Sequence, residues 1–115
     1  MLITVDPASA VPLFEQLVDG IRGGIVSGRI RAGERLPAAR ELADSLDVNI
    51  HTVLRAYQVL RDEGLLDLRR GRGATVAAGA DYAPLDEAVR AVIAAARKHG
   101  VSESQLMSLI REANR

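Results

Sequence analysis

Residues 47–63, DVNIHTVLRAYQVLRDE, are the stretch on which the interpretation of the whole chain depends. Apolar residues recur in it at helical spacing, which predicts a helix with one face against a core. These core candidates are Val53, Leu54, Tyr57 and Leu60. The polar residues fall mostly on other angles and can all form hydrogen bonds with a nucleic acid; they are Asn49, His51, Thr52, Arg55 and Gln58. Because an ordinary amphipathic surface helix shows the same pattern, the flanking sequence has to decide between the two interpretations.

The composition is that of one small globular domain, or of one domain with an appendage. The chain has 115 residues, of which 48% are apolar and only 3% aromatic, so its core must consist mainly of Leu, Val, Ile and Ala. The formal net charge is zero, which argues weakly against a nucleic-acid binder. Lys98 is the only Lys among fifteen cations. The abundant Arg suits phosphate and guanine recognition, although a GC-rich genome would produce the same bias.

The sequence lacks the residue sets that catalysis or metal binding would need. It contains no Cys, which excludes disulfides, thiolate zinc sites and a cysteine nucleophile. His51 and His99 lack a ligand-like spacing, and no paired carboxylates or nucleophile–base set stands out. We therefore expect neither an enzyme nor a metal or other cofactor.

The N-terminus, MLITVDPASAVPL, has neither a basic start nor a long apolar run, so it does not resemble a signal peptide. No apolar stretch approaches the roughly 20 residues that a membrane span needs. We therefore expect a cytoplasmic protein without a membrane partner.

Turn and capping residues divide the chain into seven predicted elements. Pro12 suits the first turn of a helix, Gly28 suits the end of one, and Pro37 disfavours a helix at the residue before it. Asn49 is a good N-cap, and Ser102 begins a capping-box sequence. The predicted elements are helices over about 12–27, 38–46 and 49–63, strands over 65–68 and 74–78, and helices over 84–99 and 102–114.

The first of these helices contains Gly20, Gly23 and Gly24. Each Gly weakens a helix by up to about 1 kcal/mol relative to Ala. Together they leave a thin face, against which another element could pack closely.

Three helices with a tight turn between the second and third, followed by a hairpin, are the layout of a winged helix-turn-helix. We therefore predict a mainly α fold with a small β-hairpin. Residues 1–79 would form the winged helix-turn-helix DNA-binding domain, and residues 80–115 a two-helix tail.

Three clusters suit contact with DNA. The N-terminal half of the 49–63 helix would enter the major groove, where Asn49, His51, Thr52 and Arg55 would reach base edges or phosphates. Arg35 and Arg40 flank Pro37 and suit the phosphate backbone, although Arg40 could instead pair with Asp44 one helical turn away. The hairpin tip, with Arg69, Arg70, Gly71 and Arg72, suits a narrow minor groove, with a solvated turn as the alternative.

The two tail helices cannot cover both of their apolar faces by folding on each other alone. We expect them to form a dimer interface; packing back on the winged domain is the alternative. The residues expected at this interface are Leu85, Val89, Val92, Ile93, Leu106, Leu109 and Ile110.

Residues 12–77 resemble the DNA-binding domain of the GntR family of bacterial transcriptional regulators. The segments that match the family are PLFEQLVDGIRGGIVSGRI and AGERLPAARELADSLDVNIHTVLRAYQVLRDEGLLDLRRGRGATV. The short tail is similar to that of the YtrA-like subfamily, in which such helices form the dimer. The resemblance implies DNA contacts by Arg35, Arg40, Asn49, His51, Thr52, Arg55, Arg70, Gly71 and Arg72.

The chain departs from the family pattern at three places. Ala38-Ala39 removes a hydroxyl cap from the second helix, and Asp47 stands where Gly is usual, so it is expected in the left-handed region. Ile50 and Leu54 replace residues that are often polar; either thymine methyl contact or core packing would explain them.

These observations lead us to expect a homodimeric repressor that binds a palindromic operator on double-stranded DNA. A small-molecule effector is possible, and nothing in the sequence identifies it. The alternative is a winged-helix protein–protein interaction module without sequence-specific DNA binding, which the neutral net charge would favour.

Overall fold

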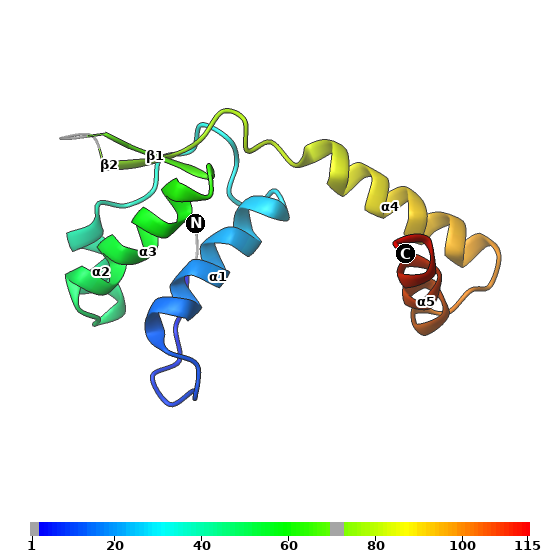
Figure 1. The fold of residues 1–115 in the computed structure, drawn as a ribbon, viewed down its shortest axis with the longest axis horizontal. Helices are drawn as coiled ribbons and strands as arrows, with labels where there is room; N and C mark the ends of the chain where they lie inside the picture. The colour runs from blue at the N-terminus through cyan, green and yellow to red at the C-terminus, as the bar shows by residue number, and fades with distance from the viewer. Residues whose placement is uncertain (1–2, 70–72) are drawn as a thin grey trace. The chain divides into compact units, whose positions relative to one another are not determined.

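The computed structural model describes residues 3–69 and 73–115. The chain divides into two compact units, with the boundary between Tyr82 and Ala83 (Figure 1). This boundary lies three residues beyond the expected one at 79/80, because Ala80 is buried in the core of the first unit and Tyr82 packs partly against it. The elements are α1 (Leu13–Val26), α2 (Ala39–Leu46), α3 (Ile50–Asp62), β1 (Leu66–Arg69), β2 (Gly73–Val76), α4 (Ala83–Lys98) and α5 (Glu103–Ala113). The mainly α fold with a small β-hairpin is confirmed.

The first unit is a winged helix-turn-helix with an aliphatic core. α3 packs against both α1 and α2, and its C-terminal end leads into β1 (Figure 1). Leu17, Ile21 and Ile25 of α1 are almost fully buried against Val53 and Leu60 of α3. The helical spacing of these residues is therefore the spacing of one shared core.

The expected core face of α3 is wrong at one position. Leu54 is 39% exposed, whereas Ala56 is completely buried beside Val53. The buried side of α3 therefore consists of Val53, Ala56, Tyr57 and Leu60. These residues are three or four positions apart along the helix, except for the adjacent pair Ala56 and Tyr57. Leu54 lies one residue outside this stripe.

The thin face of α1 is used at one of its three glycines. Gly24 is buried, and a Cβ placed on it would lie 2.6 Å from Cδ1 of Ile30. The N–H of Ile30 also donates to the carbonyl of Gly24 at 2.9 Å. A Cβ placed on Gly20 or Gly23 would have no neighbour within 4 Å, so no other element packs closely against these two glycines.

Asp47 and Asn49 shape the turn between α2 and α3, and both adopt the conformations that the sequence predicted. Asp47 has φ 55° and ψ 47°, which is the left-handed conformation expected for it. The side chain of Asn49 caps α3, because its Oδ1 accepts a hydrogen bond from the N–H of His51 at 2.8 Å. The turn therefore joins α2 to α3 through only three residues, 47–49.

The hairpin is antiparallel, with Leu66 opposite Val76 and Arg69 opposite Gly73. Its second strand is also paired on the other edge, which the sequence did not predict. Gly33 and Leu36 donate to the carbonyls of Val76 and Ala74, and Val76 donates to Glu34, each at 2.9 Å. The segment that enters α2 is therefore held against the base of the hairpin.

The second unit consists of α4 and α5, joined by a turn in which Gly100 has φ 67°. Ser102 and Gln105 form the predicted capping box: the Ser102 hydroxyl accepts from the N–H of Gln105, and the Ser102 N–H donates to the Gln105 side chain. Within residues 3–69 and 73–115, none of the helices combines the length and apolar character that crossing a membrane requires.

Candidate nucleic-acid interface

One face of α3 is free of core contacts and carries most of its polar residues. His51, Arg55 and Gln58 are exposed on it, and Thr52 at its border is half-buried. Leu54 lies among them, three residues after His51 and four before Gln58, so all three share one side of the helix. This exposed face offers both hydrogen-bonding groups and one apolar side chain.

Asn49 lies at the start of this face, but its role as N-cap limits what it can contribute. Its carbonyl oxygen already accepts the hydrogen bond from His51. The remaining donors are on the amide nitrogen, so Asn49 can offer hydrogens to a phosphate or a base acceptor.

Arg55 makes a contact that the sequence did not predict. Its guanidinium carbon lies 4.1 Å from the centre of the Phe14 ring, in the geometry of a cation–π interaction. Phe14 comes from α1, so only the fold brings the two together. The stacked guanidinium keeps its edge N–H groups available, which fits contact with phosphate better than free sampling of bases.

Arg40 is exposed in the first turn of α2. Over the described part of the chain, no ion pair joins it to Asp44, so the expected alternative is not formed. No side chain caps this helix, as the Ala38-Ala39 sequence predicted. Its first backbone N–H groups therefore lie open beside Arg40, in the arrangement that attracts an anion.

The buried Tyr57 fixes the start of α2. Its hydroxyl donates to the carbonyl of Pro37 at 2.7 Å, and burial raises the pKa of Tyr57 to about 12, with the nearby Glu41 carboxylate adding to the effect. Because Pro37 lies two residues before the start of α2, this hydrogen bond ties the position of Arg40 to that of α3.

The hairpin of β1 and β2 is the wing of this fold. It contributes Arg69, which is exposed at the end of β1. Arg35 is exposed on the segment paired with β2, where it lies opposite Thr75. Arg70, Gly71 and Arg72, the expected wing tip, lie outside the described residues.

A hollow of ≈ 310 Å³ lies where α2, α3 and the wing meet. No pattern in the sequence indicated this hollow, since its walls come from three separate segments. Its lining is mostly apolar and comprises Ala38, Ala39, Leu54, Tyr57, Gln58, Leu68, Arg69, Gly73 and Ala74.

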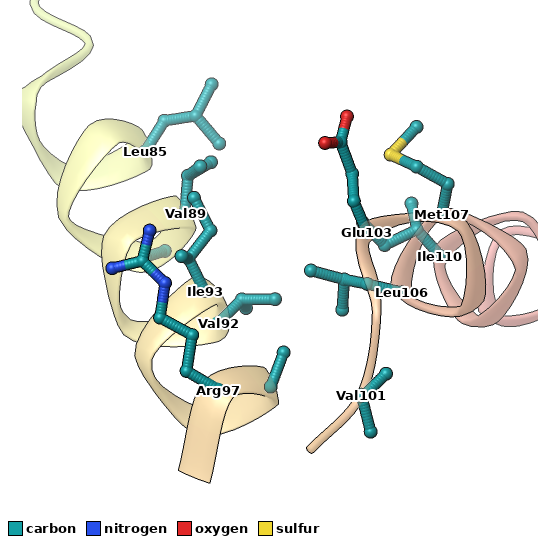
Figure 2. A pocket seen from close by; sticks show the side chains of 12 residues that line it. Leu85, Val89, Val92, Ile93, Arg97, Val101, Glu103, Leu106, Met107 and Ile110 are labelled. Carbon is teal, nitrogen blue, oxygen red and sulfur yellow. The ribbon is translucent and has the colours of Figure 1, made fainter. Parts of the chain in front are cut away.

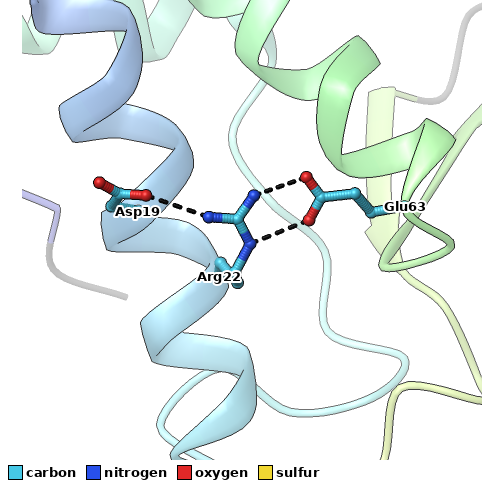
Figure 3. A network of polar contacts seen from close by, with 3 residues as sticks. All are labelled: Asp19, Arg22 and Glu63. Atoms are coloured by element: carbon cyan, nitrogen blue, oxygen red, sulfur yellow. Dashed lines mark hydrogen bonds and ion pairs between the residues drawn. The ribbon is translucent and has the colours of Figure 1, made fainter.

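The far end of α3 is anchored to α1 by an ionic network (Figure 3). Nε of Arg22 donates to one carboxylate oxygen of Glu63 at 2.9 Å, Nη2 donates to the other oxygen, and Nη1 donates to Asp19 at 3.0 Å. The hydrogen bond from Arg22 lowers the pKa of Glu63 and raises that of Arg22. This network joins helices of the fold and leaves the exposed face of α3 untouched.

The second unit contains an apolar groove of ≈ 640 Å³ between α4 and α5 (Figure 2). Leu85, Val89, Val92 and Ile93 point into it from α4, towards Leu106 and Ile110 of α5. Arg97 and Glu103 are charged members of its lining. Six of the seven expected interface residues line this groove; Leu109 is 59% exposed and is not among its lining residues.

The fold and its exposed helix define a class of protein, the DNA-binding regulators with a winged helix-turn-helix. Residues 13–76 match the family described as "Bacterial regulatory proteins, gntR family". The chain therefore belongs to the gntR family, and it is a DNA-binding transcriptional regulator.

Individual relatives agree with this assignment. The chain is 30% identical to the HTH-type transcriptional repressor YtrA of Bacillus subtilis over 96% of its own length and 91% of the relative's. The solved structure of YtrA from Sulfolobus acidocaldarius, a GntR-family transcription factor, is 33% identical, with TM-score 0.60 over 85% of this chain and 99% of that one. A protein-interaction module is thus not favoured.

One solved relative contains DNA. The structure of AraR(DBD) in complex with operator ORX1 is 31% identical, with TM-score 0.57 over 64% of this chain and 90% of that one. In that relative, a domain of this fold binds an operator.

Proposed function

We propose that the chain is a homodimeric repressor that binds a palindromic operator on double-stranded DNA in the cytoplasm. Support for repression comes from the similarity to the Bacillus subtilis repressor over nearly the whole chain. Support for an operator as the partner comes from the likeness to the AraR complex. A small-molecule effector stays a prediction from the sequence.

The single observation that carries the proposal is the exposed face of α3 beside the open start of α2. His51 and Thr52 lie in the first turn of α3, where a recognition helix meets base edges. Arg40, Arg55 and Arg35 are exposed around this face. In the proposed complex these three Arg contact phosphates, Asn49 offers its amide hydrogens, and Arg70, Gly71 and Arg72 enter the minor groove.

The apolar groove of the second unit supports the dimer. Val89, Val92 and Ile93 are 47%, 42% and 38% exposed. Helices of globular proteins normally bury a continuous apolar stripe of this kind against another surface. A second copy would present the same stripe, because a twofold interface brings identical surfaces together. We propose that α4 and α5 of two copies cover each other, with Leu85, Leu106, Leu109 and Ile110 as further contacts.

Binding-site selection from random duplexes tests the DNA proposal. The wild-type protein should enrich a palindrome and bind it at physiological salt in excess competitor DNA. Arg40→Ala should weaken binding to every sequence, since a phosphate contact is not sequence-specific, whereas His51→Ala should change the enriched sequence. Arg90→Ala is the matched control on α4, where Arg90 pairs with Asp86 one helical turn away. Failure to enrich any sequence would contradict the proposal.

Sedimentation of two neighbouring variants tests the dimer. Ile93→Asp places a charge in the groove and should give a monomer, while Ala94→Asp, which lies on α4 outside the groove lining, should stay dimeric. The monomer should also lose the preference for a full palindrome over a half-site. A dimer that survives Ile93→Asp would rule out this interface.

A further inference from the structure

Leu54 is the one large apolar side chain exposed on α3. It is 39% exposed, whereas Ile50, one turn earlier, is half-buried and packs against the core. An isolated exposed Leu needs no explanation. Leu54, however, stands between His51 and Gln58, in the part of α3 that the proposed function brings to the bases.

The surroundings of Leu54 are largely apolar. It forms part of the hollow with Ala38, Ala39 and Leu68, none of which offers a side-chain hydrogen bond, while Arg69 is the charged member of the lining. Gln58, one helical turn further, lines the same hollow and supplies an amide. A base edge at this hollow would therefore contact the apolar side chain of Leu54, with the amide of Gln58 beside it as both donor and acceptor.

Only one base presents an apolar group in the major groove, namely thymine with its C5-methyl. Cytosine and guanine present polar atoms at their edges, and these would lose water against Leu54 without gaining a partner. A Gln amide pairs with adenine through N6 and N7. The side chains of Leu54 and Gln58 thus match a thymine and an adenine.

We propose that Leu54 reads a thymine in each operator half-site through its C5-methyl group, and that Gln58 reads an adenine next to it. This inference rests on the proposed function, since it needs α3 in the major groove. It favours the first of the two explanations left open for Leu54, thymine methyl contact over core packing, and it assigns a base to Gln58.

The test replaces thymine by deoxyuracil in the selected operator, one symmetric pair of positions at a time. This substitution removes only the C5-methyl. At one pair, the wild-type protein should lose affinity about fifteenfold, because burying one methyl is worth about fourfold and two half-sites multiply. Fluorescence anisotropy at fixed salt measures the dissociation constants.

Two variants connect the methyl to the side chain. Leu54→Ala should bind the thymine and deoxyuracil operators equally at that pair, and Gln58→Ala should lose discrimination only at the adjacent adenine. Val11→Ala, an exposed apolar residue before α1, is the matched control and should keep the wild-type profile. Leu54→Asn keeps the branched shape of the side chain but replaces its two methyl groups by an amide, so it should shift the selected base away from thymine.

Equal affinity for all deoxyuracil operators would overturn the inference, as would an undiminished methyl effect in Leu54→Ala. Thermal unfolding of each variant separates loss of fold from loss of contact. Absence of any sequence preference in the wild-type protein would instead contradict the proposed function.

Discussion

At the scale of single residues, Asp47 shows how a short turn depends on backbone conformation. Its φ of 55° puts an L-residue in a region that costs roughly 1–2 kcal/mol for most side chains. Asp tolerates that region better than most residues, which made the conformation predictable from the departure at this position. Gly would adopt it without a Cβ penalty.

We therefore expect Asp47→Gly to raise the free energy of unfolding by about 0.5–1 kcal/mol, because it removes the backbone strain at the C-cap of α2. Asp47→Ala removes the same charge but keeps the Cβ, so it should lower the stability instead. Urea titration of both variants measures the difference. Equal stability of the two would show that the backbone conformation is not the cause.

Gly24 and Gly23 provide a second test at residue scale. A Cβ at Gly24 would collide with the buried Ile30, so Gly24→Ala should destabilise the fold by about 1–3 kcal/mol. Gly23→Ala meets nothing within 4 Å and should stabilise it by roughly 0.5–1 kcal/mol through helix propensity. Thermal unfolding of the pair should move in opposite directions; a shift in the same direction would contradict the close approach of Ile30.

At the scale of elements, the sequence predicted what local signals encode. The N-cap at Asn49, the capping box at Ser102 and the ends of the helices agree with the structure to within one or two residues. The placement of Leu54 was wrong because Val53 and Leu54 are adjacent and equally apolar, while the small Ala56 gave a weak signal for the buried side. Periodicity cannot choose between neighbours when both are Leu-like.

Contacts between distant segments were not predictable. The stacking of Arg55 on Phe14 and the pairing of residues 33–36 with β2 join segments far apart in the sequence. Neither has a composition signal, since each depends on how complete elements pack. The hollow beside Leu54 arises in the same way, from three segments that only the fold unites.

The Arg22–Glu63 contact predicts a pH dependence at this scale. Arg22 lowers the pKa of Glu63, so the folded state favours the carboxylate. The resulting stabilisation is present above the ordinary pKa of about 4.3 and is lost as pH falls through the lowered folded value. Because Glu63 is partly exposed, the effect should be small, as for other surface pairs.

Urea titration at several pH values checks this expectation. Glu63→Gln should be less stable than the wild type at pH 7, and the difference should vanish at low pH. Asp62→Asn is the matched control, because its partner Arg61 is the adjacent residue in the chain rather than a different helix. A constant difference between wild type and Glu63→Gln at all pH values would argue against the ion pair.

At the scale of the whole molecule, the neutral net charge shows why a sum of charges is a poor guide to DNA binding. Arg35, Arg40 and Arg55, the phosphate contacts proposed above, are all exposed although the net charge is zero. Four phosphate contacts per protomer, one of them from the wing, would neutralise about eight charges in a dimer.

We therefore expect the logarithm of the binding constant to fall with the logarithm of salt concentration at a slope of about −7. Ile93→Asp should roughly halve that slope if it separates the protomers, since each monomer then keeps only its own contacts. Anisotropy titrations over a range of salt concentrations give both values. A nearly flat dependence would contradict phosphate contacts by these Arg residues.

The pairing of Gly33 and Glu34 with Val76 has a consequence for the order of folding. These bonds close residues 33–76 into a loop, because its two ends pair with each other while α2, α3 and the hairpin lie between them in the sequence. Contacts of such long sequence separation form late. In pulsed hydrogen exchange, the amides of Leu36 and Val76 should therefore gain protection together, after those of α3. During synthesis, the segment that leads into α2 therefore gains this pairing only once Val76 has been made, after all of α3.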